Sequence, residues 1–424
     1  MNEVSIIICG LLTCLAIFYV WLTVAFVSKL NQYRSTPQEK DILIDEKKNL
    51  PSASVILCLR GADPFLPKCL EALLNQNYPD YELQIVVDSD KDPAWEMVTQ
   101  TVEKQAAKHV KISSLVVPRL TCSLKCSALV QAVSNLDANC EVVALVDADT
   151  VVHSNWLRQL ISPLADPQVG ATTGNRWFLP QGKYWGSVVR YIWNVAAVIQ
   201  MHFYRIPWGG SLAIKTKVFR RTQLLKKWEQ AFNEDTMLKH ILQQQGLRVE
   251  FVPSIIMVNR EETDLKSFIP WVQRQLLCSR LYHTSWKAIA IHGVLTTVIP
   301  TVAIALSPFM WLNGQLPAVA YFGSGLAIYV VTQILCLVIL EYQVRGIVKL
   351  KGEILPSIDA ATVFKVLLAL PLTQMVYTFA LTSAMFMQQV KWRGITYQIK
   401  GPWDIKLVEY QPYTATETSV DSIM

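Results

Sequence analysis

Two carboxylates end a strongly apolar run near the middle of the chain. Residues 142–146 read Val-Val-Ala-Leu-Val, and Asp147 and Asp149 follow them. The run predicts a buried strand, and ligands of open α/β sheets bind beyond the carboxyl ends of strands. Paired carboxylates at that edge suit Mg²⁺ or Mn²⁺ that carries a diphosphate. The alternative for so short a pattern is an ordinary solvated junction of strand and loop.

A second pair of acids follows another expected strand. Residues 82–87 read Glu-Leu-Gln-Ile-Val-Val, and Asp88 and Asp90 come directly after them. Because the carboxyl ends of parallel strands meet at one edge of a sheet, both acid pairs should lie together. The repeated arrangement favours a nucleotide site at this edge.

The elements that position these acids alternate between strand and helix. Short apolar runs predict the strands, and apolar residues at helical spacing predict the helices between them. The expected strands are residues 54–59, 82–87, 112–117 and 141–146, and the expected helices are 66–75, 93–107 and 125–133. This alternation is typical of a doubly wound, mostly parallel α/β sheet.

Two later segments carry further candidate residues. Trp208, Gly209 and Gly210 precede an apolar run, and paired glycines let a backbone turn sharply or approach a ligand. Glu234 and Asp235 open an expected helix, where acids usually cap the helix or interact with its dipole. Both segments therefore have a structural as well as a functional explanation.

Charged residues are missing from three long stretches. No Asp, Glu, Lys or Arg occurs in residues 4–28, 288–340 or 366–390, and only 17% of the chain is charged, against roughly 25% in soluble domains. A helix needs about 20 apolar residues to cross a bilayer. We expect one N-terminal span, two spans within 288–340 that separate near residues 313–317, and a fourth segment at 366–390.

These stretches divide the chain into four parts. We expect an N-terminal anchor at residues 1–30, a polar α/β domain with interfacial helices at 50–287, a transmembrane region at 288–390, and a C-terminal segment and tail at 391–424. The aromatic-rich, amphipathic residues 191–206 fit either the core of the polar domain or a helix at the membrane interface.

The flanks of the first apolar stretch indicate its orientation. It follows Met-Asn-Glu without a basic region and exceeds the apolar core of a usual signal peptide, so we expect a retained anchor. Lys29 and Arg34 follow it, which places the polar domain in the cytoplasm. Four full spans would return the C-terminus to the outside, whereas Lys391 and Arg393 favour the cytoplasm. Residues 366–390 are therefore expected to re-enter the membrane or lie flat.

Cysteines and net charge narrow the class of protein. The nine cysteines form no Cys-x-x-Cys pair, which fits reduced thiols. Cys122 and Cys126 have metal-pair spacing, but packing explains them better because no other ligand is near. The net charge of +6 suits an anionic membrane face and a nucleotide. No basic run is interleaved with aromatic residues, so nucleic-acid binding is not expected.

The order of these parts resembles the membrane-anchored glycosyltransferases of family two and their ceramide glucosyltransferase relatives. The likeness covers about residues 50–290 and the flanking spans, and it implies a GT-A fold for the α/β domain. Residues 88–94, Asp-Ser-Asp-Lys-Asp-Pro-Ala, look specifically like the ceramide glucosyltransferase version.

The resemblance implies roles for the donor-side residues. Asp88 matches the acid that contacts the nucleotide base, with Asp90 as a nearby alternative. Lys125, in Leu-Lys-Cys-Ser-Ala-Leu, matches a lysine near the diphosphate. Asp147 and Asp149 match the Asp-x-Asp motif, and Asp149 is the more direct ligand of Mg²⁺ or Mn²⁺.

The resemblance also covers the acceptor side. Asp235 matches the catalytic base, with Glu234 beside it. Trp208, Gly209 and Gly210 match a Gly-rich segment near the acceptor.

The last motif of the family, Gln/Arg-x-x-Arg-Trp, is incomplete in this chain. Its best match keeps Arg274 but has Leu277 and Cys278 in place of Arg and Trp. The intact motif is typical of polymer synthases, so the departure favours a smaller acceptor. Gln273, Gln275 and Arg280 could compensate, and Trp271 and Trp286 are close.

The resemblance implies an inverting transferase that moves a sugar, glucose in the first instance, from a UDP-sugar to a membrane lipid hydroxyl such as that of ceramide. The product would be a β-glycolipid, and diacylglycerol or a sterol-like lipid is an alternative acceptor. The other functions to weigh are a processive synthase of the cellulose or hyaluronan type and a membrane protein with a non-catalytic GT-A domain. Few spans without intramembrane charge argue against transport.

Overall fold

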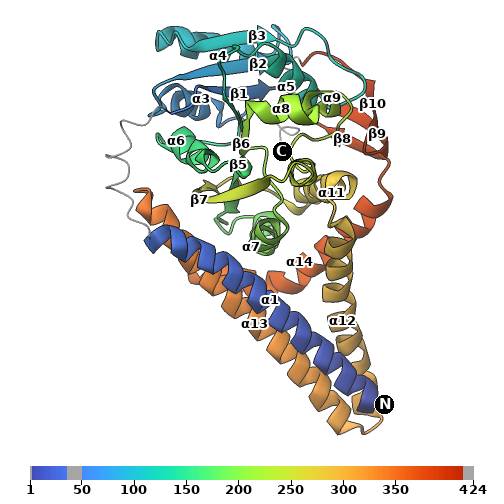
Figure 1. The fold of residues 1–424 in the computed structure, drawn as a ribbon. Coiled ribbons are helices and arrows are strands. Elements are labelled where there is room, and N and C mark those ends of the chain that lie inside the picture. The colour runs from blue at the N-terminus through green and yellow to red at the C-terminus, as the bar shows by residue number, and fades with distance from the viewer. Residues whose placement is uncertain (1, 36–49, 414–424) are drawn as a thin grey trace.

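The computed structural model describes residues 2–35 and 50–413, so residues 414–424 of the expected C-terminal segment lie outside the described residues. A mostly parallel sheet forms the upper domain in Figure 1, and long helices project from it. The seven strands are β1 (Ala53–Leu59), β2 (Tyr81–Val87), β3 (Val110–Ser114), β4 (Val142–Val146), β5 (Val169–Phe178), β6 (Ser211–Lys215) and β7 (Arg248–Asn259). Their order is β3-β2-β1-β4-β6-β5-β7, and β6 alone runs antiparallel to its neighbours.

Helices cover both faces of this sheet. One face packs on α3 (Leu66–Leu74), α4 (Pro93–Lys104), α6 (Trp156–Ile161) and the 3₁₀ helix η2 (Ser162–Ala165), and the other packs on α5 (Leu124–Ser134), α8 (Thr216–Thr222), α9 (Leu224–Trp228) and α10 (Leu238–Gln243). Side chains of a strand alternate between faces: Val55 and Leu57 join the first apolar cluster, and Ile56 joins the second. The predicted doubly wound α/β fold is confirmed.

Parallel pairing aligns the ends of the strands that carry the acids. Leu59 of β1 pairs with Val87 of β2, and Leu57 of β1 pairs with Val146 of β4. Asp88 and Asp147, which follow these ends, therefore leave the sheet at the same edge, as predicted.

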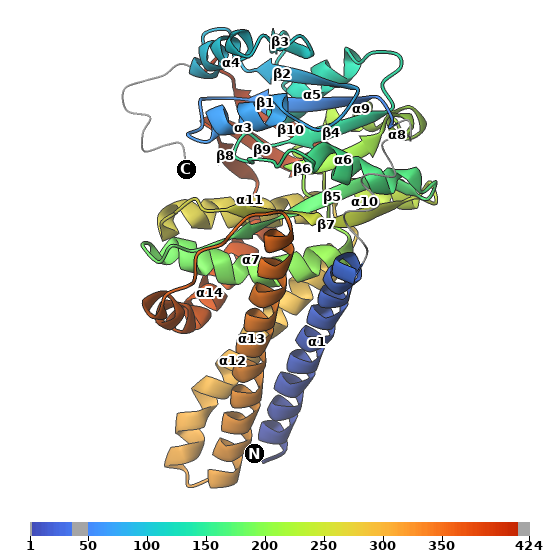
Figure 2. The same cartoon turned by 90° about the vertical axis from the view of Figure 1, so that its left-hand side faces the viewer.

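Four helices are long and apolar enough to cross a membrane: α1 (Asn2–Ser35), α12 (Trp286–Leu312), α13 (Leu316–Leu350) and α14 (Ala360–Phe386). Helices α1, α12 and α13 form a bundle that projects from the sheet domain, and α1 lies along α13 (Figures 1 and 2). The chain is a multi-pass membrane protein, as its uncharged stretches predicted.

Helix α14 takes a different course from the other three. It lies beneath α7 (Trp185–Tyr204) and α11 (Leu265–Tyr282), at the end of the bundle nearest to the sheet (Figures 1 and 2). Its re-entry into a bilayer, or its lying flat in one, stays a prediction.

Helices α7 and α11 form a layer between the sheet and the bundle. Tyr191, Val195 and Ile199 of α7 are buried in an apolar cluster that also contains residues of α11 and α14. This burial favours the core explanation for one face of the aromatic-rich segment.

A small antiparallel sheet follows α14, where the sequence alone predicts only a segment and tail. Its strands are β8 (Gln389–Trp392), β9 (Ile395–Gly401) and β10 (Asp404–Glu409). Ile395, Tyr397 and Ile399 alternate toward the apolar cluster around α5. The amide of Leu407 donates to the carbonyl of Leu120 at 2.8 Å. These contacts attach the C-terminal sheet to the α/β domain.

Candidate functional site

A cavity of about 200 Å³ lies at the carboxyl edge of the large sheet. The loops after β1, β2 and β4 meet there with the start of α5, the loops before β6 and α10, and one face of α11. Most of the sequence-predicted residues line it: Asp88, Lys125, Asp147, Asp149, Trp208, Gly209, Glu234, Asp235, Arg274 and Gln275.

Three predicted residues are not brought to this cavity. Asp90 is exposed, one residue beyond Ser89 in the loop that leads to α4. Arg280 donates at 2.7 Å to the carbonyls of Met385 and Met387, so it holds the end of α14 instead. Gly210 does not line the cavity, although its neighbours Trp208 and Gly209 do. Neither Asp90 nor Arg280 is therefore a candidate for direct contact with a ligand there.

Lys125 joins two of the acids. It lies in the first turn of α5, which Ser123 caps, and its Nζ is 2.6 Å from Asp147 Oδ1 and 2.7 Å from Glu234 Oε1. Burial opposes the charge of Lys125, but the two carboxylates outweigh burial and raise its pKa well above the ordinary value. Burial likewise opposes ionisation of Asp147, and Lys125 reverses this and lowers the pKa of Asp147. The ammonium group therefore stays charged, and its single positive charge offsets one of the two negative charges of Asp147 and Glu234.

Asp149 is in a different situation. Within the described part of the chain it forms no ion pair, and the hydroxyl of Thr150 donates to it at 3.3 Å. Burial, and next the charge of Asp147, raise the pKa of Asp149. A bound cation would compensate both for the burial of the Asp149 carboxylate and for its repulsion by Asp147.

The donor set suits a metal ion that arrives with a ligand. No group of three Asp, Glu, His or Cys residues in 2–35 and 50–413 is arranged to hold an ion with protein atoms alone. Mg²⁺ commonly takes one or two carboxylates and completes its shell with substrate phosphates and water. Asp149, assisted by Asp147, fits that mode of binding.

Asp235 is held in one orientation by three donors. Its Oδ2 accepts from the amide of Gly209 at 2.7 Å. Its Oδ1 accepts from Thr236 Oγ1 at 2.8 Å and from the side-chain amide of Asn233. The N-cap of α10 is Met237 and has no side-chain cap bond, so the capping explanation of Asp235 is wrong.

The paired glycines are required by the close approach of backbone to these carboxylates. A Cβ on Gly209 would lie 2.1 Å from Glu234 Oε1 and 3.1 Å from Asp235 Oδ2. A Cβ on Gly210 would lie 2.3 Å from the Trp208 ring and 2.6 Å from Asp147 Oδ2. A side chain at either position would displace the site acids, which a plain turn does not explain.

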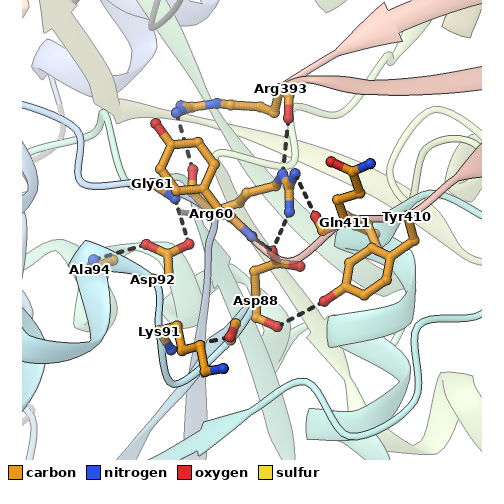
Figure 3. A network of polar contacts seen from close by, with 12 residues as sticks. Arg60, Gly61, Asp88, Lys91, Asp92, Ala94, Arg393, Tyr410 and Gln411 are labelled. Carbon is orange, nitrogen blue, oxygen red and sulfur yellow. Dashed lines mark hydrogen bonds and ion pairs between the residues drawn. The ribbon is translucent and has the colours of Figure 1, made fainter. Parts of the chain in front are cut away.

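Asp88 lines the cavity and lies beside Arg60, Tyr410 and Gln411 (Figure 3). Its Oδ2 pairs with Arg60 and accepts from the amide of Tyr413 at 2.9 Å. The hydroxyl of Tyr410 donates to its carbonyl at 3.2 Å, and Arg60 also donates to the carbonyl of Gln411 at 3.1 Å. Asp88 is 5% exposed, and its Oδ1 has no hydrogen-bond donor in the described residues. This oxygen is therefore a buried acceptor whose hydrogen-bonding capacity is unused in the described part of the chain.

A second cavity of about 200 Å³ lies on the membrane side of the first. Its wall is largely apolar and comes from α7, α11 and all four membrane helices. The residues that line both cavities are Arg176, Trp208, Asn233, Asp235, Trp271, Gln275 and Cys278. Asp235 is therefore accessible from either side.

The cysteines do not supply a nucleophile. All nine are free, as predicted, and Cys122 and Cys126 are buried in the apolar core rather than arranged around a metal. Burial raises the pKa of the Cys58 and Cys278 thiols, which line the polar cavity, to about 12. Both are therefore protonated at neutral pH.

Several lining residues are absent from the sequence-based set. Arg60 and Asp63 follow the carboxyl end of β1, so the rule applied to β2 and β4 would have found them. Arg176 comes from β5, and Trp392 and Arg393 come from the turn between β8 and β9. Their place in this cavity depends on elements that are distant in the sequence.

Two curated relatives share part of the chain. An N-acetylglucosaminyltransferase of Rhizobium meliloti (strain 1021) is 24% identical over 249 residues, which cover 55% of this chain and 56% of that protein. One of Rhizobium leguminosarum bv. viciae is 26% identical over 236 residues, which cover 52% and 53%. The chain spans about half the length of the curated relatives it matches.

Among solved structures, one similar fold is the mannosyltransferase PcManGT from Pyrobaculum calidifontis in complex with GDP-Man and Mn²⁺. Its TM-score is 0.46 at 15% sequence identity, and the match covers 89% of this chain and 99% of the mannosyltransferase chain. GalNAc-T7 with UDP, GalNAc and Mn²⁺ has a TM-score of 0.40 at 14% identity, with coverage of 57% and 50%. The model of glycosyl transferase family 21 matches residues 10–403. The chain therefore belongs to glycosyl transferase family 21.

Proposed function

We propose that this glycosyltransferase moves a hexose from a UDP-sugar to the hydroxyl group of a membrane lipid, with inversion at the anomeric carbon. One observation carries the proposal. Asp235 stands in the common wall of a polar cavity rich in charged groups and an apolar cavity between membrane helices. A carboxylate there can meet a nucleotide sugar on one side and an amphiphile on the other.

The donor is proposed to occupy the polar cavity. The free Oδ1 of Asp88 can accept the N–H of a uracil ring. Lys125 and Arg274 lie around Asp147 and Asp149, where they favour a diphosphate. Asp149 and Asp147 would hold Mg²⁺ or Mn²⁺, which supplies charge stabilisation to the leaving diphosphate when bound.

Asp235 acts as the general base in this proposal. A lipid hydroxyl is a weak nucleophile until a carboxylate within hydrogen-bond reach takes its proton. The three donors that fix Asp235 hold it ready for that proton. Attack opposite the leaving diphosphate turns an α-linked donor into a β-glycoside. Glu234, which Lys125 engages, positions this ammonium rather than accepting the proton.

The acceptor is proposed to be a lipid such as ceramide, with diacylglycerol or a sterol-like lipid as alternatives. The apolar cavity between α1, α7, α12, α13 and α14 suits acyl or alkyl chains. Its polar side chains include Gln200, Gln374 and Asn194, which can bind a small headgroup. Trp208 and Gly209 form the edge that the headgroup would pass to reach Asp235.

Two sugars are candidates for the donor. Glucose follows from the resemblance of residues 88–94 to ceramide glucosyltransferases. N-acetylglucosamine is the second candidate, because the two curated relatives are named N-acetylglucosaminyltransferases. We propose that the α/β domain faces the cytoplasm, because Lys29 and Arg34 stand at the end of α1 nearest to it.

The test is a product analysis with the full chain in detergent or nanodiscs. Purified protein is incubated with Mg²⁺, membrane lipid extract and UDP-glucose, UDP-galactose or UDP-N-acetylglucosamine, and lipids are analysed by mass spectrometry. The proposal predicts a lipid that has gained one hexose, or one N-acetylhexosamine with the second candidate donor, and a β linkage by NMR. Insoluble polymer would support a processive synthase instead, and no product with any donor or lipid would support a non-catalytic domain.

A further inference from the structure

We propose that the turn between β8 and β9 completes the site for the donor diphosphate. In this proposal Arg393 binds the diphosphate directly, and Trp392 positions Arg274 for the same purpose. The inference rests on the proposed function, because it assumes a nucleoside diphosphate in the polar cavity. It assigns a role to a segment more than a hundred residues from the incomplete motif at Arg274.

Arg274 is a cation without a carboxylate partner. It lines the polar cavity, and none of the ion pairs or hydrogen bonds in the described part of the chain involves it. Its guanidinium lies 4.6 Å from the centroid of the Trp392 ring, within the range of a cation–π contact. Burial lowers the pKa of Arg274 from its ordinary value. Trp392 fixes the direction of the guanidinium but leaves its N–H groups for an anion.

Positions 277 and 278 cannot supply the missing pair. Leu277 is fully buried and Cys278 is 6% exposed, and both belong to the apolar cluster around α5. Cys278 lines the cavity with a neutral thiol, whereas Trp392 at the end of β8 and Arg393 in the following turn line it with an indole ring and a guanidinium. The cavity therefore contains an arginine and a tryptophan beside Arg274, although the motif positions 277 and 278 hold other residues.

The turn holds Arg393 over the acids. Arg393 Nη2 is 2.6 Å from Asp63 Oδ2, and its carbonyl accepts from Arg60 Nε at 2.9 Å. Figure 3 shows the Arg393 side chain extending across Gly61 above this network. Burial opposes its charge, but Asp63 first, and then Asp149 and Asp147, raise its pKa. The guanidinium therefore already lies within the field of the acids expected to hold the metal ion.

The backbone at this turn is unusual for an arginine. Trp392 pairs with Ile395 across a two-residue turn, and Arg393 and Gly394 have φ angles of 49° and 77°. Turns with two positive φ angles favour Asn or Asp followed by Gly. The ring contact at Trp392 and the ion pair with Asp63 are the interactions that offset the unfavourable conformation of Arg393.

Arg176 is the competing candidate for the same role. It lies within 5.1 Å of the ring centroids of Trp208 and Trp271, and it lines both cavities. This position is nearer to the acceptor, so we expect Arg176 to act on the sugar or the lipid headgroup. A comparison of variants at the two arginines separates the possibilities.

The test measures binding of UDP, UMP and uridine by calorimetry, with Mg²⁺ present and the full chain in detergent. Arg393→Asn removes the cation and tolerates the positive φ. Loss of a hydrogen-bonded charge predicts a ten- to hundredfold weaker Kd for UDP, with uridine affinity unchanged. Lys391→Ala, an exposed residue on the same hairpin, is the matched control and should leave all three affinities unchanged.

Asp63→Asn separates direct binding from a structural role. If Arg393 only stabilises Asp63, the double variant Asp63→Asn/Arg393→Asn regains UDP affinity, and the proposal is wrong. If Arg393 binds the diphosphate, the double variant stays weak and Asp63→Asn alone binds UDP at least as well as the unmodified chain.

Trp392 is tested through its effect on Arg274. Trp392→Leu should weaken UDP about as much as Arg274→Gln does, Trp392→Phe should restore most of the affinity, and the double variant should lose no more than either single one. Additive losses, or equal weakening of UDP and uridine, would overturn the positioning role. If the unmodified chain binds no nucleoside diphosphate, the proposed function itself fails. If it binds UDP and Arg393→Asn has no effect while Arg176→Gln does, only this inference fails.

Discussion

The two cavities share a wall, yet they are built from different parts of the chain and from different chemistry. The polar cavity is assembled from strand ends and loops, and most of its charged side chains follow β1, β2 and β4 or precede α10. The apolar cavity is assembled mainly from helices, four of which can cross a membrane. One side therefore suits a charged donor from water, and the other suits a lipid.

This difference explains why Asp235 needs so many hydrogen bonds. In the proposed reaction Asp235 must take a proton from the acceptor hydroxyl. A cation paired with Asp235 would lower its basicity more than neutral hydrogen-bond donors do. Gly209, Asn233 and Thr236 hold it with neutral donors, whereas Lys125 engages its neighbour Glu234. Substitutions in either cavity should accordingly affect one substrate and spare the other.

Asp235→Asn tests the shared wall and has the largest expected effect. An amide cannot take a proton, so kcat should fall about 10²- to 10⁴-fold, whereas the Kd for UDP stays the same. Asp90→Asn, at an exposed acid outside the cavity, is the control and should turn over normally. Normal turnover of Asp235→Asn would show that Asp235 is not the general base.

Asp149→Asn tests the polar cavity. Loss of the unpaired carboxylate should abolish tight Mn²⁺ binding by electron paramagnetic resonance, and it should lower kcat about 10²- to 10³-fold. Affinity for the lipid acceptor should not change. Full activity in excess chelator would show that the ion has no part in the reaction.

Gly209→Ala moves both carboxylates at the boundary. The added Cβ would lie 2.1 Å from Glu234 Oε1, and a displacement of about 1 Å can cost roughly 10²-fold in rate. Gly401→Ala, where nothing lies within 4 Å of the new atom, should leave the rate unchanged. Equal effects of both substitutions on rate and thermal stability would indicate a general folding defect.

Ala197→Phe tests the apolar cavity and has the smallest expected effect. Ala197 of α7 lines this cavity alone, so the larger ring should raise the KM for the lipid about tenfold without changing the Kd for UDP. Leu368→Phe, on α14 at a side chain that is 51% exposed, is the control. A weaker Kd for UDP in Ala197→Phe would mean that the two cavities do not divide the substrates.

The sequence predicts the polar cavity better than the apolar one, for a physical reason. Strand ends are marked by local patterns, so Asp88, Asp147 and Asp149 could be placed at one edge before the fold was known. Asp63 follows β1 by the same rule and could have been found in the same way. The apolar cavity depends on the packing of five or more helices, which no local pattern encodes.

The C-terminal hairpin shows the same limit within the polar cavity. Trp392 and Arg393 are far from the other site residues in sequence, and strands β8 to β10 are short. Only their packing on the α/β domain brings Arg393 to Asp63. Conversely, Arg280 was predicted at the site because it lies close to the motif in sequence. In the structure its guanidinium donates to carbonyls at the end of α14 instead.

The account depends most directly on a lipid lying in the apolar cavity beside Asp235. A photoactivatable ceramide carrying a diazirine on its acyl chain can be crosslinked to the full chain in nanodiscs, and the labelled peptides can be identified by mass spectrometry. The account predicts labelling of α7 and α14 near Ala197 and Gln374, lost in the presence of unlabelled ceramide and in Ala197→Phe. Labelling confined to the outward faces of the helices, unchanged by competitor and by the substitution, would contradict it.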